Sequence, residues 1–112
     1  MLNKIAQIIY NKKGSNILAL DLQGVSTIAN YLLIAEGNVD CHVISIAKAI
    51  IEDVKHPIHV EGLANGDWVV IDFGDVIVHL FRPGLREKYS LEKLWKSGQI
   101  VDLSIETSLT PH

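Results

Sequence analysis

The sequence predicts a single α/β domain with a mixed β-sheet of about five strands flanked by helices. Three observations lead to this fold class. The chain has 112 residues, the size of one domain. It contains no internal repeat or low-complexity segment. Short apolar runs typical of strands alternate with longer segments whose apolar residues recur at helical spacing, so the two kinds of element are expected to share one core.

The first element is expected to be an N-terminal helix of about three turns. Its apolar residues recur at helical spacing, and Lys12 and Lys13 lie near its end, where the helix dipole favours cations. Gly14 follows as a stop signal. The apolar positions are Leu2, Ile5, Ala6 and Ile9.

Two short apolar runs come next, at residues 16–23 and 31–36. Each is followed by a glycine, Gly24 or Gly37, and both are too short for a helix and of the right length for a strand. The sequence therefore predicts two strands joined through residues 25–30.

A second, longer helix is expected from Asp40, which can serve as its N-cap, to about Lys55. Pro57 cannot continue a helix, which sets this end. The predicted helix has a wide apolar stripe formed by Val43, Ile44, Ala47, Ile50, Ile51 and Val54.

A β-hairpin is expected after a short strand at residues 58–61 and a loop at 62–66. Residues 68–72 and 75–81 form its strands, with the turn at Phe73 and Gly74. This turn pairs residues whose numbers sum to 147. One face then holds the pairs Trp68 with His79, Val70 with Ile77, and Asp72 with Asp75, and the other holds Val69 with Val78 and Ile71 with Val76. The second face is wholly aliphatic and is the natural core face, so the first is either exposed or covered by something other than that core.

The C-terminal part is expected to contain one or two short helices over residues 85–96, begun by Pro83. The pattern then fades into serine, threonine and proline. The sequence predicts a domain over residues 1–98 and a loosely ordered tail over residues 99–112.

Composition excludes several classes of protein. A single cysteine, Cys41, rules out a disulfide framework or a cysteine zinc cluster. No apolar run reaches the length of a membrane span, and the N-terminus lacks the layout of a secretory signal, so a soluble cytoplasmic protein is expected. The formal net charge is −3, which disfavours direct nucleic-acid binding by the whole domain.

The acidic residues are unevenly distributed. Residues 36–75 hold eight acidic and two basic residues, a balance of −6, whereas residues 82–96 have a balance of +3. By base rate most of these carboxylates are solvated surface. The acidic middle of the chain nevertheless suits a basic partner.

Asp72 and Asp75 are the first candidates for a functional role, because like charges opposed across a hairpin disfavour folding. Three interpretations stay open. Asp72 is a turn former beside a flexible glycine, or both carboxylates meet lysines or arginines of a protein partner. The third is a Mg²⁺ site completed by Asp21, although no phosphate-binding loop accompanies it.

Trp68 and His79 are the second candidates. A tryptophan beside acidic residues on a sheet face has the composition of a binding hot spot. A satellite core under the C-terminal helix explains it equally well. No Ser or Cys with the context of a nucleophile accompanies His79, and the other histidines lack metal-ligand spacing with it. No catalytic residue, metal ligand or cofactor is therefore assigned.

The sequence resembles the ribosomal silencing factor family, also called the Iojap or YbeB family. The resemblance is carried by residues 68–95, WVVIDFGDVIVHLFRPGLREKYSLEKLW, and upstream by ALDLQGVSTIANYLLIAEG (residues 19–37) and VEGL (residues 60–63). It covers residues 2–96. The sequence departs from the family in two places. The segment EGNVDCH (residues 36–42) stands where the family commonly has a Thr-Gly-x-Ser run and a basic residue, and the interval before Val60 is shorter.

The resemblance implies a nucleotidyltransferase-like topology without the catalytic site, and a translational repressor that is not an enzyme. Family members bind the large (50S) ribosomal subunit through ribosomal protein uL14, block the small subunit from joining, and so lower translation when nutrients are scarce. The matching residues expected to face that basic protein are Glu61, Trp68, Asp72, Asp75 and His79.

The resemblance also implies a homodimer, for which Val70, Ile77 and Phe81 are candidate contacts. Two alternatives stay open. One is a metal-dependent nucleotidyltransferase built on Asp72 and Asp75, and the other is an RNA contact through the basic residues of segment 82–96, which is expected to be minor or absent.

Overall fold

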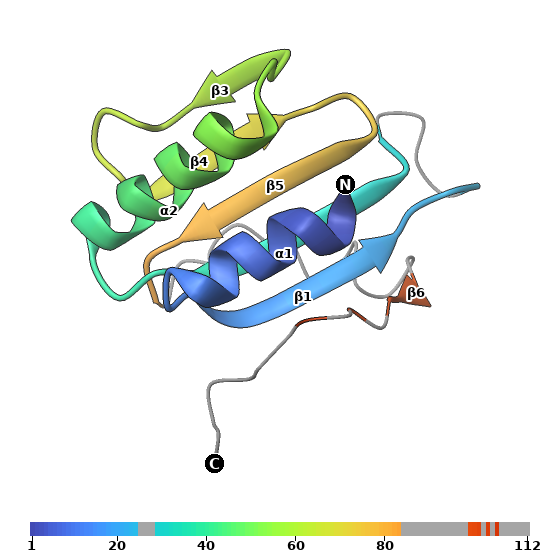
Figure 1. Cartoon of the computed structure of the whole chain (residues 1–112), viewed down its shortest axis with the longest axis horizontal. Coiled ribbons are helices and arrows are strands. Elements are labelled where there is room, and N and C mark those ends of the chain that lie inside the picture. The colour runs from blue at the N-terminus through green and yellow to red at the C-terminus, as the bar shows by residue number, and fades with distance from the viewer. Residues whose placement is uncertain (25–28, 84–98, 102, 104, 106–112) are drawn as a thin grey trace.

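The structure is a computed structural model that describes residues 1–24, 29–83, 99–101, 103 and 105. Within these residues, two helices and six strands follow one another in the order α1, β1, β2, α2, β3, β4, β5, β6 (Figure 1). The strands form one sheet in the order β3-β4-β5-β2-β1-β6. β2 and β5 run parallel and the other neighbours antiparallel. The α/β fold class and the mixed sheet are confirmed, and β6 is a strand that the sequence did not indicate.

Helix α1 (Leu2–Asn11) forms as expected and buries Ile5, Ala6 and Ile9. The chain then turns directly into β1 (Ser15–Asp21) through Gly14. A Cβ atom at Gly14 would lie 2.4 Å from the Cγ2 atom of Ile9, so only glycine lets the strand begin this close to the helix.

Helix α2 (Asp40–Val54) starts one residue earlier than predicted. Val39 is its N-cap and no side chain caps it; Asp40 is the first helical residue, and its Oδ1 accepts a hydrogen bond from the Cys41 backbone N–H at 2.8 Å. The Asp40 carboxylate lies in the first turn, where it interacts favourably with the positive end of the helix dipole. Neither α1 nor α2, the helices of the described part, is long and apolar enough to cross a membrane.

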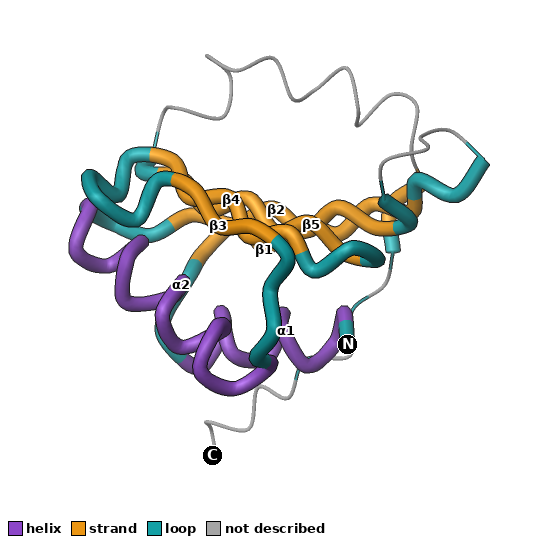
Figure 2. Tube along the Cα trace, turned by 90° about the horizontal axis from the view of Figure 1, so that it is seen from above, coloured by secondary structure: helices purple, strands orange, loops and turns teal. Residues whose placement is uncertain are grey.

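The molecule has two main layers, because both helices cover the same face of the sheet (Figure 2). The core between them is formed by α1, α2 and every second residue of the strands. On β2 (Tyr31–Glu36) these are Leu33 and Ala35. The hairpin strands β4 (Trp68–Asp72) and β5 (Val76–Phe81) contribute Val69, Ile71, Val76, Val78 and Leu80. The aliphatic face of the hairpin is thus the core face, as predicted.

The predicted hairpin register is wrong by two residues. The observed pairs sum to 149, so Trp68 faces Phe81, Val70 faces His79, and Asp72 faces Ile77 rather than Asp75. The turn lies at Gly74 and Asp75, because the Phe73 N–H donates to the Val76 carbonyl oxygen at 3.0 Å. Gly74 has φ +90°, as the first central residue of such a tight turn requires, whereas Phe73 avoids positive φ. A shift of two residues leaves the side chains of the paired strand residues on their predicted faces, whereas Asp75 moves from a strand into the turn.

The sheet face turned away from the helices holds a second buried cluster. Its buried members are Leu20, Leu22, Leu32, Ile34 and Phe81, and Trp68 and Ile77 pack against it. The edge strand β3 (His59–Glu61) extends this face, since Glu61 pairs with Val70 and His59 with Asp72. We call the residues Glu61, Trp68, Val70, Asp72, Ile77, His79 and Phe81 the outer face.

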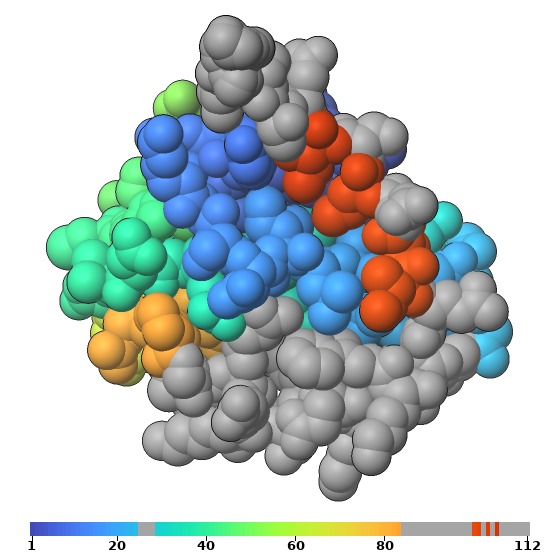
Figure 3. Space-filling view, turned by 90° about the horizontal axis from the view of Figure 1, so that it is seen from below, coloured from blue at the N-terminus to red at the C-terminus, as the bar shows by residue number. Residues whose placement is uncertain are grey.

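The prediction of a loosely ordered tail is wrong for the first residues after position 98. Strand β6 (Gln99–Ile100) pairs antiparallel with β1, and the Val101 N–H donates to the Ala19 carbonyl oxygen at 2.9 Å. Val101, Leu103 and Ile105 pack against the main core, and the described residues from β6 onward, red in Figure 3, lie beside the blue residues of α1 and β1. The helices predicted over residues 85–96 lie outside the described residues.

Candidate functional site

The side chains of Trp68 and His79, both expected to face a partner, are hydrogen-bonded to each other. The Trp68 Nε1–H donates to the His79 Nδ1 at 2.9 Å. Their ring centroids are 5.7 Å apart, and Phe81 stacks against both rings, with centroids 5.3 Å from Trp68 and 6.1 Å from His79. Because an indole N–H can only donate, His79 Nδ1 must carry a lone pair, which fixes the neutral tautomer protonated on Nε2.

Burial acts on His79 in the same direction. Desolvation lowers the pKa of His79 from 6.5 to about 4. The neutral imidazole is therefore held both by its surroundings and by its hydrogen bond. Phe81 is fully buried and Trp68 half-buried in the second cluster, so the pair packs against the domain. The C-terminal helix of the satellite-core interpretation lies outside the described residues. These rings form a stacked, mainly apolar part of the outer face.

The acidic residues of the outer face differ in how they are paired. Glu61 Oε2 lies 2.6 Å from His59 Nε2, and both side chains are largely exposed. Asp72 Oδ1 accepts the Gly74 backbone N–H at 2.7 Å, as the turn-former interpretation predicts. Among the described residues no cation pairs with Asp72.

Asp75 was predicted to face Asp72 across the hairpin, and this prediction is wrong. Asp75 lies in the turn, where its Oδ1 accepts a hydrogen bond from the Asn30 amide and its carbonyl oxygen accepts the backbone N–H groups of Asn30 and Tyr31. These bonds tie the hairpin turn to the start of β2. The repulsion expected between the two carboxylates is thus avoided by the shifted register.

The carboxylates of the metal alternative are not brought together. Asp72 lies in one cross-strand row with Ile77, Leu32 and Leu20 on the outer side of the sheet. Asp21 follows Leu20 on β1 and so points to the helix side. Within the described ranges, no group of three or more His, Cys, Asp or Glu side chains could hold a metal ion.

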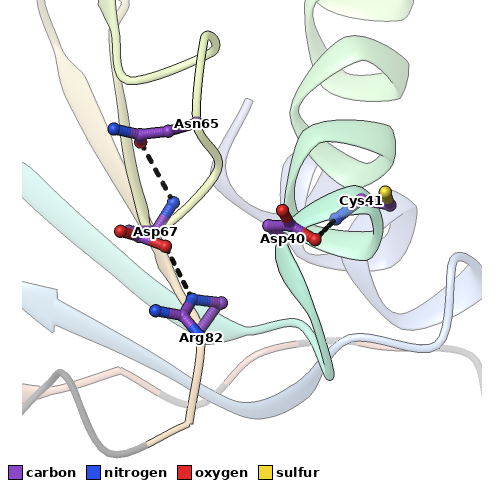
Figure 4. Close-up of polar contacts among 5 residues, drawn as sticks. All are labelled: Asp40, Cys41, Asn65, Asp67 and Arg82. Carbon is purple, nitrogen blue, oxygen red and sulfur yellow. Dashed lines mark hydrogen bonds and ion pairs between the residues drawn. The ribbon is translucent and has the colours of Figure 1, made fainter.

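One ion pair of the hairpin was missed by sequence reasoning. Arg82 Nε donates to Asp67 Oδ1 at 2.7 Å, and the Arg82 N–H donates to the Asp67 carbonyl oxygen at 3.1 Å (Figure 4). Asn65 accepts a weak bond from the Asp67 N–H, while Asp40 and Cys41 lie apart on α2. The signal was present, because 67 and 82 also sum to 149. The wrong register concealed it.

The candidate dimer contacts are unevenly exposed. Val70 and Ile77 are partly buried on the outer face, whereas Phe81 is fully buried within the chain. Phe81 therefore belongs to the second buried cluster and offers no surface of its own. A dimer that uses Val70 and Ile77 stays a prediction.

Comparison with known proteins gives consistent matches. The sequence model of a family described as "Ribosomal silencing factor during starvation" (RsfS) matches residues 1–111. The ribosomal silencing factor RsfS of Bacillus subtilis is 42% identical over 97 residues, covering 83% of this chain and 82% of that protein. A crystal structure from Bacillus halodurans has a TM-score of 0.78 and 34% identity, covering 91% of this chain and 96% of that one. A mouse protein named "Mitochondrial assembly of ribosomal large subunit protein 1" is 24% identical, covering 95% of this chain and 51% of its own length.

Proposed function

This chain belongs to the ribosomal silencing factor family, and from that premise we propose that it represses translation by occlusion. It binds the large ribosomal subunit through ribosomal protein uL14 and prevents the small subunit from joining, in the cytoplasm and under nutrient limitation. The observation that carries this proposal is the family match over residues 1–111. The name of the mouse relative, which refers to the large subunit, supports the choice of subunit.

The geometry supports docking through the outer face and the hairpin turn. Asp72 and Asp75 have no cationic partner among the described residues, and Glu61 is largely exposed at the edge of the sheet. Trp68, His79 and Phe81 link the two strands of the hairpin beneath these carboxylates by a hydrogen bond and stacked rings. An acidic surface is complementary to a basic protein, and such complementarity raises the rate and specificity of association. No bond has to be made or broken for this action.

Sedimentation of mixed ribosomal subunits tests the proposal. Large and small subunits are mixed under conditions that allow association and run on a sucrose gradient with and without the protein. We expect the protein to sediment with the large subunit and to reduce the peak of joined subunits. If the protein stays at the top of the gradient and the joined peak is unchanged, the proposed function is wrong.

Charge variants of the outer face test the docking surface. The double variant Glu61→Lys/Asp72→Asn should weaken large-subunit binding about tenfold or more, because it removes two negative charges and adds one positive charge. Asparagine at position 72 keeps an acceptor for the Gly74 N–H, so the turn is preserved. The matched control is Glu52→Lys/Asp53→Asn, which makes the same charge change on exposed residues of α2. Equal binding by both double variants would count against this surface.

A crosslink tests the partner itself. Cys41 is exposed, so a Cys41→Ser background leaves a single thiol when Glu61→Cys is introduced. A short thiol-to-amine crosslinker at position 61 should join the protein to uL14 in large subunits. The same crosslinker at Glu52→Cys is the control. Crosslinks from position 61 only to other ribosomal proteins would contradict the choice of uL14.

A further inference from the structure

A surface hollow lies at the end of the sheet where the hairpin turns, next to the start of α1. Its volume is about 320 Å³. Three segments distant in the sequence meet there: the N-terminus, the junction of the hairpin turn with β2, and the chain after β6. The lining residues are Met1, Leu2, Asn3, Tyr31, Asp75, Val76 and Val101.

The lining combines an apolar surface with one carboxylate. Val76 is almost fully buried, and Leu2 and Val101 are partly buried against the main core, so these three form the apolar part. Asp75 is exposed. The hollow lies on the helix side, since it includes residues of α1, whereas Asp72 belongs to the outer face. The two carboxylates therefore lie on opposite sides of the hairpin turn.

Asp75 is held in a fixed position. Its backbone carbonyl oxygen accepts the N–H groups of Asn30 and Tyr31 at 3.0 and 3.1 Å, and its Oδ1 accepts the Asn30 amide. Among the described residues its Oδ2 has no partner, and the amine of Met1, another lining residue, forms no ion pair with it. A carboxylate fixed through one oxygen, with the other oxygen available, is preorganised for a cation.

We propose that this hollow receives a lysine or arginine side chain of the protein partner. The apolar lining contacts the aliphatic stem of that lysine or arginine, and Asp75 binds its cationic end. This matches the two parts of a long basic side chain, an apolar stem and a charged head. The inference rests on the proposed function and deepens it: the partner would contact Asp72 on the outer side and insert one side chain beside Asp75 on the helix side. A small hollow filled by one anchoring residue is a common form of binding hot spot.

Two variants test the hollow against purified large subunits. Asp75→Asn keeps an acceptor for the Asn30 amide and removes the charge, and we expect the dissociation constant to rise about tenfold. Glu52→Gln is its control and should bind like the unaltered chain. Asn3→Lys places a cation of the chain's own beside Asp75 and should weaken binding similarly, whereas Asn11→Lys, the same change at the other end of α1, should not.

A small probe tests the hollow without the ribosome. Nα-acetyl-lysine amide at millimolar concentration should shift the amide NMR signals of Tyr31, Asp75 and Val76, and acetyl-norleucine amide, which lacks the ammonium group, should not. The Asp75→Asn variant should abolish these shifts. Two results would overturn the inference and leave the proposed function standing. One is equal NMR shifts with both probes. The other is that Asp75→Asn binds large subunits like the unaltered chain while Glu61→Lys/Asp72→Asn fails to bind. If the unaltered chain does not bind large subunits, the proposed function fails, and the NMR result alone decides whether the hollow binds a basic side chain.

Discussion

At the scale of single residues, the side chains expected to face a partner divide into two groups. Trp68 and His79 are bonded to each other at 2.9 Å and pack on the fully buried Phe81, so their main task is to support the outer face. Asp72 and Asp75 keep their charge without a cationic partner among the described residues. Under the proposed function, the carboxylates would recognise a basic partner directly and the rings would support the strands that carry them.

The low pKa of His79 predicts a loss of stability in mild acid. Since the pKa of His79 is about 4 in the folded chain and 6.5 for an ordinary histidine, the unfolded chain takes up the proton first as the pH falls. Stability contributed by neutral His79 is complete above about pH 6.5 and is lost toward pH 4, by roughly 3 kcal/mol. Urea unfolding between pH 4.5 and 7.5 measures the loss.

Two glutamine variants distinguish the contribution of His79 to this loss of stability from those of the carboxylates and the other histidines. His79→Gln, whose amide oxygen can accept the indole N–H, should remove most of the decline across this pH range. His56→Gln, at an exposed position, should keep it. A decline of the same size in both variants would show that other groups cause it.

At the scale of elements, the hairpin and the sixth strand decide how the sheet ends. The hairpin turn at Gly74 and Asp75 places Asp72 on the outer face and Asp75 beside α1. Strand β6 pairs with β1 and forms the edge of the sheet opposite β3. The chain after it brings Val101 onto the main core and into the wall of the hollow. The tail beyond residue 98 is thus partly a structural element.

A pair of neighbouring substitutions tests this role of the C-terminal segment. Val101→Asp puts a charge against the core and should lower the free energy of unfolding by about 1–3 kcal/mol. Ile100→Asp, at a side chain that is 73% exposed, should cost less than about 1 kcal/mol. Thermal or urea unfolding of the two variants gives the comparison. Equal stability of both would mean that packing after β6 contributes little.

At the scale of the whole molecule, the acidic end of the hairpin and the helix surface carry different charge. The outer face and turn present Glu61, Asp72 and Asp75, whereas the helices and their ends carry Lys4, Lys12, Lys13, Lys48 and Lys55 beside three acidic residues, Asp40, Glu52 and Asp53. Within the described residues, this distribution supports the proposal that a basic protein is approached with the hairpin turn forward and the helices turned away.

Docking driven by this charge distribution should weaken with salt. At constant Mg²⁺, raising monovalent salt from about 50 to 200 mM should raise the dissociation constant for large subunits several-fold, since exposed charges are screened within about 10 Å. The variant Glu61→Lys/Asp72→Asn should show a smaller salt effect than the unaltered chain. A salt-independent dissociation constant would indicate a mainly apolar contact instead.

The sequence by itself determined the fold class, both helices, five of the strands and the core face of the hairpin. Each of these depends on local periodicity or on a stop signal such as Gly14 or Pro57, which a single segment carries. The faces survived a wrong register because side chains alternate with a period of two, and the error was two residues.

Tertiary structure alone decided the features that depend on which segments meet. The turn lies one residue later than predicted because, of Phe73, Gly74 and Asp75, only Gly74 has a positive φ. The resulting register separates Asp72 from Asp75 and pairs Asp67 with Arg82. The strand β6 and the hollow beside Asp75 each join residues far apart in the chain. No local pattern records such contacts, because they are set by packing between segments.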